Sequence, residues 1–137
     1  MSEMVKIQDE LHAPKGQDNK FGKYKYRSCE DIVEAVKPIL AKHGCWLNIT
    51  DEMVMLGDRF YVRANASVMK EDKAIATASG YAREAFSRKG MDDSQLTGAT
   101  SSYARKYALN GLFAIDDTKD ADSQDNSSYE TVKNAVE

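Results

Sequence analysis

Apolar residues in this chain recur with a helical period in one stretch and alternate with polar residues in the stretches after it. The helical period predicts a helix over about residues 29–42, built on the apolar positions Ile32, Val33, Val36, Ile39 and Leu40. Ser28 and Asp31 have the spacing of a capping box at its start, and Gly44 is expected to end it. Pro38 lies inside this helix and predicts a kink.

Three strand-like stretches follow, separated by turn residues. The first covers residues 45–49 and extends through 53–56, the second runs from Arg59 to Lys70, and the third from Ala74 to Phe86. The second and third strands each have one apolar or small face, formed by Phe60, Val62, Ala64, Ala66 and Val68, and by Ala74, Ala76, Ala78, Gly80 and Ala82. We therefore expect an α+β fold, an antiparallel three-stranded sheet packed by helices in α-β-β-β-α order.

A second helix is predicted from about Asp93 to Asn110, where Asn110-Gly111 is expected to end it. A helical wheel divides this helix into three faces. The face assigned to the core consists of Leu96, Thr100, Tyr103 and Tyr107. An adjoining stripe of small residues, suited to tight packing on the sheet, consists of Thr97, Ser101, Ala104 and Ala108.

The third face of this helix has hydrogen-bond donors, two cations and no acid of its own. It consists of Gln95, Gly98, Ser102, Arg105 and Lys106. A phosphate backbone needs such donors, and an arginine can hold two phosphate oxygens at once. The alternative is an ordinary solvated helix face. The two tyrosines have an alternative as well, which is a platform on which bases stack.

A second candidate for nucleic-acid contact precedes the first helix, where cations alternate with aromatic residues. Its residues are Lys20, Phe21, Lys23, Tyr24, Lys25, Tyr26 and Arg27. Cations would meet phosphates and aromatic rings would stack on bases, although lysines also protect an edge strand from pairing. Further candidate cations lie on the second and third strands and in the loop after them: Arg63, Arg83, Arg88 and Lys89.

The charge is distributed unevenly along the 137 residues. Residues 1–110 carry 17 Lys and Arg against 15 Asp and Glu, whereas residues 111–137 carry 2 against 7. The net charge of −3 therefore belongs to the C-terminal end and does not exclude DNA binding by the body. We expect a flexible segment over residues 1–19, one domain over 20–116 and an acidic, disordered tail over 117–137.

Signals for catalysis, metal binding and membrane insertion are weak. Cys29 and Cys45 form no CxxC unit, and no nucleophile or zinc motif has the right spacing. We expect no enzymatic activity, no cofactor, no metal and no membrane partner. Because the start of the chain lacks the pattern of a signal peptide, we expect a cytoplasmic protein.

With these residues in view, the chain resembles the Erf family of phage single-strand annealing proteins. The resemblance rests on the helical stretch from Gly98 to Ile115 and its Asp-rich continuation, and on Phe21-Gly-Lys-Tyr-Lys-Tyr26. It covers about residues 20–122 and implies a β-β-β-α core similar to that of the Rad52 annealing proteins. Where the family often has two arginines, this chain has Arg105 and Lys106, and a lysine lacks the bidentate fork.

The resemblance implies ATP-independent binding of single-stranded DNA and annealing of complementary strands in phage recombination, in the cytoplasm of the bacterial host. It also implies a ring or helical homo-oligomer, with a single-strand binding protein or an exonuclease as a further partner. The residues that match the family motif are Ser101, Ser102, Tyr103, Arg105, Lys106 and Tyr107.

Three other functions remain open from the sequence. The element order is also that of a double-stranded RNA-binding module, although the acidic start of the second helix disfavours it. A metal-dependent nuclease would use the aspartates after residue 115. An interaction scaffold would have oligomerisation as its only function.

Overall fold

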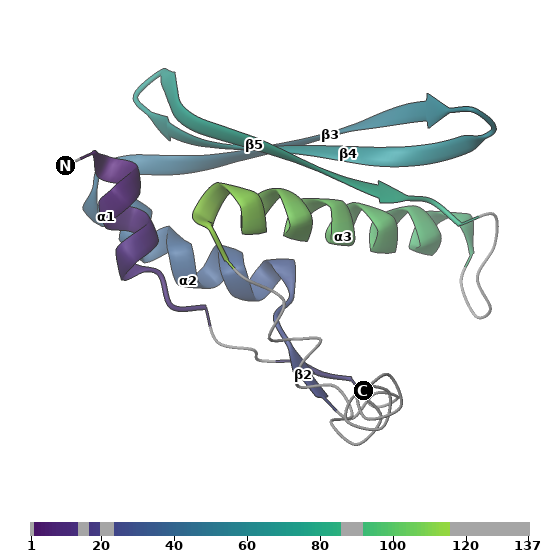
Figure 1. Ribbon diagram of the computed structural model, residues 1–137, viewed down its shortest axis with the longest axis horizontal. Coiled ribbons are helices and arrows are strands. Elements are labelled where there is room, and N and C mark those ends of the chain that lie inside the picture. Colours follow the sequence, from purple (N-terminus) through teal and green to yellow (C-terminus); the bar gives the residue numbers. More distant parts are fainter. Residues whose placement is uncertain (1, 14–16, 20–23, 86–91, 116–137) are drawn as a thin grey trace, which may run out of the picture.

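The computed structural model describes residues 2–13, 17–19, 24–85 and 92–115, and it contains one helical layer and one main sheet (Figure 1). The elements in chain order are α1 (Glu3–Glu10), β1 (Gln17–Asn19), β2 (Tyr24–Tyr26), α2 (Cys29–Lys42), β3 (Cys45–Leu56), β4 (Arg59–Lys70), β5 (Lys73–Arg83) and α3 (Asp93–Phe113). The predicted α+β class and the α-β-β-β-α order are confirmed. Within the described residues, no helix is both long enough and apolar enough to span a bilayer.

The main sheet is antiparallel with strand order β3-β4-β5, and β1 pairs with β2 in a separate two-stranded sheet. Gly57 has a φ of 65° in the tight turn between β3 and β4, a conformation that glycine adopts without strain. The β4–β5 ladder has an irregularity between Val68 and Met69. The three helices lie on one side of the sheet (Figure 1).

The predicted start of α2 is confirmed in detail. The backbone N–H of Asp31 donates to Ser28 Oγ over 3.1 Å, and the Ser28 N–H donates to Asp31 Oδ2 over 2.9 Å. The two bonds form the capping box. At the other end, Gly44 follows the helix with a φ of 70°, as expected of a glycine that ends a helix.

The core lies between the sheet and the helices, and its tightest point is the contact of β5 with α3. The central strand β4 contributes four buried residues to this core, as the alternation predicted: Val62, Ala64, Ala66 and Val68. Gly80 of β5 faces the backbone of α3, and a Cβ atom on Gly80 would lie 2.4 Å from Ala108 N and 2.5 Å from Ala104 O. Only glycine allows this approach. Ala104 and Ala108 are fully buried, so the predicted small-residue packing stripe is confirmed for them.

The predicted core position of Tyr103 and Tyr107 is wrong, because each of these tyrosines is 49% exposed. The close approach of the helix to Gly80 leaves no room for a phenol ring between α3 and the sheet. The small residues occupy that position instead, and the tyrosines are turned to the side. Leu96 and Thr100 from the same predicted face are buried as expected.

The predicted end of the second helix is also wrong. α3 continues through Gly111 to Phe113 and ends at Ala114, whose φ of 56° is left-handed. Leu112 and Phe113 are almost fully buried, so their packing extends the helix past the Asn-Gly signal.

The N-terminal segment contains an ordered helix within the stretch expected to be flexible. α1 begins at the N-cap Ser2, whose side chain accepts a bond from the Val5 N–H. Its Ile7 has no exposed surface and belongs to the core cluster. The burial of Ile7 therefore anchors this short helix to the rest of the molecule.

Candidate nucleic-acid interface

The predicted phosphate-binding face of α3 meets an acid that comes from another element. Asp51, in the middle of β3, accepts bonds from Arg105 Nε over 3.1 and 3.3 Å and from Arg105 Nη2 over 3.1 Å. It also accepts a bond from Ser101 Oγ over 2.5 Å. Asp51 lies opposite Ala64 on the helix-facing side of the sheet, so its carboxylate points at α3. Arg105 and Ser101 therefore hold the helix to the sheet.

The environment of Asp51 favours its charged form. Partial burial alone would raise the pKa of Asp51, but the hydrogen bonds from Arg105 and Ser101 and the guanidinium charge outweigh burial. The net pKa lies below the ordinary value of 3.8. Asp51 therefore remains ionised at neutral pH, and the charge of Arg105 is already matched by a carboxylate.

The other residues of this predicted face differ in their hydrogen bonds and in their exposure. Gln95 Oε1 accepts the Asp92 N–H over 3.1 Å and completes the N-terminal capping box of α3. Ser102 Oγ donates to Cys29 Sγ over 3.8 Å, and burial raises the pKa of that thiol. Gly98 is exposed with open space around it, and Lys106 is half-buried. This face packs partly against α2 and β3 and is less open than the helical wheel indicated.

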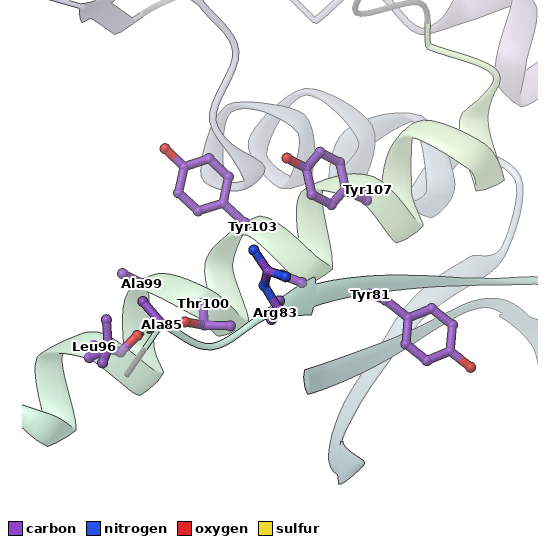
Figure 2. A pocket seen from close by; sticks show the side chains of 9 residues that line it. Tyr81, Arg83, Ala85, Leu96, Ala99, Thr100, Tyr103 and Tyr107 are labelled. Atoms are coloured by element: carbon purple, nitrogen blue, oxygen red, sulfur yellow. Dashed lines mark hydrogen bonds between the residues drawn. The ribbon is translucent and has the colours of Figure 1, made fainter. Parts of the chain in front are cut away.

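A groove lies on the other side of α3, beside the edge strand β5 (Figure 2). It has a volume of about 370 Å³. Its lining residues are Tyr81, Ala82, Arg83, Ala85, Leu96, Ala99, Thr100, Tyr103 and Tyr107. We call it the α3–β5 groove. Figure 2 shows Tyr103 and Tyr107 rising from the same side of α3, with the Arg83 guanidinium directed toward them.

The two tyrosines of the α3–β5 groove form an aromatic platform one helical turn long. Their ring centroids are 6.4 Å apart and the ring planes are inclined by 31°. Successive bases in a stacked strand are about 3.4 Å apart, so bases lying on both rings have to be unstacked from one another. The spacing suits an extended single strand better than one strand of a duplex.

Arg83 supplies the positive charge of the groove. It is exposed, and its guanidinium has no hydrogen bond or ion pair with any residue in the described part of the chain. Tyr81 points away from the tyrosine platform in Figure 2, and its ring lies 5.6 Å from the Arg63 guanidinium carbon. Arg63 is also paired with Glu52 over 3.4 Å. Arg83 and Arg63 share one sheet face as expected, but only Arg83 lines the groove.

The remaining predicted contacts divide into two groups. Arg27 is described, and its Nε donates to the Ala13 carbonyl over 2.7 Å at the start of α2. For Tyr24, Lys25 and Tyr26 only the strand β2 is described. Four candidates lie outside the described residues: Lys20, Lys23, Arg88 and Lys89. The aspartates invoked for a nuclease, which follow residue 115, lie outside them too.

Sequence reasoning gave the tyrosine platform only as the alternative to a core position, although a signal for the exposure of both rings was present. The run of alanines in β5 together with Gly80 required α3 to approach closely, and only the alanines of α3 can face such a surface. The helical wheel centred on Ala104 and Ala108 places both tyrosines at its margin. Within the described residues, no three His, Cys, Asp or Glu side chains form a group able to hold a metal ion.

The protein is therefore of the α+β class, with an antiparallel sheet packed by helices and an open groove between α3 and β5 that is lined by tyrosines and one arginine. The model of the ERF superfamily matches residues 1–137, and the chain belongs to this family. The chain is also 58% identical, over 122 residues, to the "Essential recombination function protein" of Salmonella phage P22. The match covers 89% of this chain and 58% of that protein, so the chain spans little more than half its relative's length. No solved structure matches the chain.

Proposed function

We propose that this protein binds single-stranded DNA and anneals complementary strands without ATP, as a homo-oligomer in phage recombination. Membership of the ERF superfamily and the name of the P22 relative support a role in recombination. The observation that carries the DNA-binding step is the α3–β5 groove, where Arg83, which has no ion pair with any described residue, lies beside two half-exposed tyrosines. Cations with exposed aromatic rings are the usual means of holding single strands.

Within the proposal, the tyrosines and the arginine of the groove have different roles in binding DNA. Tyr103 and Tyr107 stack on two neighbouring bases and keep them apart, because the rings are 6.4 Å from one another. Arg83 contacts a phosphate through its guanidinium fork. Stacking and phosphate contacts do not read base edges, so binding has little sequence preference and a second strand can pair with the held strand. Annealing then needs no nucleotide hydrolysis.

Arg83→Ala tests the charge in the groove. One lost phosphate contact should lower the slope of log affinity against log salt by about 0.7 for single-stranded DNA. Lys37→Ala is the matched control, because Lys37 is an exposed cation on α2 outside the groove lining. Titration of a labelled oligonucleotide at several salt concentrations measures both slopes. Equal slopes for the two variants would show that Arg83 does not contact a phosphate of the bound DNA.

The activity itself is tested with two complementary labelled strands in the absence of ATP and Mg²⁺. The wild-type protein should accelerate their pairing, and Arg83→Ala should reduce this acceleration while Lys37→Ala does not. Gel analysis after adding Mg²⁺ distinguishes annealing from cleavage. Shortened DNA would favour a nuclease and contradict the proposal.

A further inference from the structure

The end of the β3–β4 hairpin carries a group of exposed apolar side chains that the proposed DNA groove does not use. Met53, Met55, Leu56 and Phe60 are 52%, 62%, 55% and 50% exposed. We call these four residues the hairpin tip. Met55 and Phe60 are cross-strand partners next to the turn. Folded monomers rarely expose so many large apolar side chains together unless the surface binds a partner.

The opposite end of the molecule has a cavity of about 550 Å³. Leu11, Ala13, Phe113 and Ile115 form its apolar part, and His12 and Arg27 lie among its lining residues. It is bounded by the residues that follow α1 and by the end of α3. We call it the α1–α3 cavity.

The hairpin tip of one molecule cannot enter the α1–α3 cavity of the same molecule. Phe60 O accepts a bond from the Glu84 N–H, and Glu84 accepts one from Thr97, which places the tip beside the start of α3. The cavity lies at the other end of α3, which has 21 residues and is therefore about 30 Å long. Figure 1 shows the β3–β4 turn and α1 at opposite ends of the molecule.

We propose that the hairpin tip of one copy docks into the α1–α3 cavity of a second copy. Charge supports a second copy as the occupant, because the Asp58 carboxylate is exposed in the turn of the tip and the Arg27 guanidinium lies among the residues that line the cavity. Each copy has one tip and one cavity, so the contact is head-to-tail and propagates into a ring or a filament. This inference rests on the homo-oligomer of the proposed function and identifies its interface.

Two double variants separate the two surfaces. The tip variant is Met55→Glu with Phe60→Glu, and the cavity variant is His12→Glu with Ala114→Glu. All four positions are exposed, so both variants should keep the wild-type circular dichroism spectrum and melt cooperatively. Light scattering during size-exclusion chromatography should find the wild type assembled and each variant monomeric at the same concentration.

Mixing the two variants gives the decisive result. The tip variant has an intact cavity and the cavity variant has an intact tip, so a head-to-tail contact predicts one dimer and nothing larger. If the tip instead paired with another tip, the cavity variant alone would still assemble, and the proposal would be overturned. A tip variant with the wild-type mass would overturn it as well.

A separate measurement distinguishes failure of this inference from failure of the proposed function. The monomeric tip variant should bind a short single-stranded oligonucleotide with the wild-type affinity, because the α3–β5 groove contains none of the hairpin tip residues. If no form of the protein binds the oligonucleotide while the mixing result holds, the interface stands and the DNA-binding proposal fails. If the oligonucleotide binds and both variants keep the mass of the wild type, the DNA-binding proposal stands and the proposed interface fails.

Discussion

Arg83 and Arg105 lie on opposite sides of α3, and their electrostatic surroundings differ. Arg105 donates three hydrogen bonds to Asp51, whose carboxylate balances the charge of the guanidinium. Arg83 has no such partner among the described residues. The sequence showed both as cations, Arg105 on a helix face with no acid of its own and Arg83 on the third strand. The acid that matters comes from β3, about fifty positions earlier in the chain, and local spacing does not reveal it.

Asp51 predicts a specific dependence of stability on pH. The pKa of Asp51 in the folded protein lies below the ordinary 3.8. The contribution of Asp51 to the unfolding free energy is therefore complete at pH values above 3.8, and it is lost as pH falls through the folded pKa. Asp51→Asn should therefore lower the unfolding free energy at pH 7 by about 0.2–1 kcal/mol, as for a partly exposed pair. The difference from wild type should shrink on acidification.

Thermal melting of wild type and Asp51→Asn between pH 7 and pH 2.5 measures this contribution. The two curves of melting temperature against pH should converge at the acidic end. Curves that run parallel over the whole range would mean that the Asp51 carboxylate adds no pH-dependent stability.

At the scale of elements, the strands and α2 could be predicted, but the rotation and the end of α3 could not. Alternation in β4 and the capping box of α2 depend on neighbouring residues, which the sequence displays directly. The orientation of Tyr103 and Tyr107 depends on Gly80, which lies on a different element. The extension to Phe113 depends on tertiary burial of the last turn, which outweighs the local Asn-Gly signal.

The close contact of β5 with α3 predicts opposite effects for two glycine substitutions. Gly80→Ala places a methyl group against the α3 backbone and should lower the unfolding free energy by about 1–3 kcal/mol or more. Gly98→Ala fills open space on an exposed helix position and should raise it by about 0.5–1 kcal/mol. Urea unfolding of the two variants measures both effects, and equal stabilities would contradict the packing described here.

At the scale of the whole molecule, the two proposed surfaces are made by different parts of one sheet. The α3–β5 groove lies along the edge strand, whereas the hairpin tip extends from the β3–β4 turn (Figure 1). The sheet face away from the helices carries short polar side chains bonded to one another, such as Ser67 with Thr77 over 2.9 Å and Ser79 with Asn65 over 2.8 Å. Because the two surfaces share no residue, the two proposals predict that substitutions in one surface leave the proposed role of the other unchanged.

The central claim is that the tyrosine platform of the α3–β5 groove holds single-stranded DNA. It is tested most directly by the affinity for a single-stranded oligonucleotide, compared with that for the duplex of the same sequence. Tyr103→Ala with Tyr107→Ala removes both rings and should weaken single-strand binding by about thirtyfold or more, given ~1–3 kcal/mol of stacking for each of two bases. Tyr103→Phe with Tyr107→Phe retains the rings and should bind as the wild type does. Equal single-strand affinities for wild type, the alanine variant and the phenylalanine variant would contradict the claim.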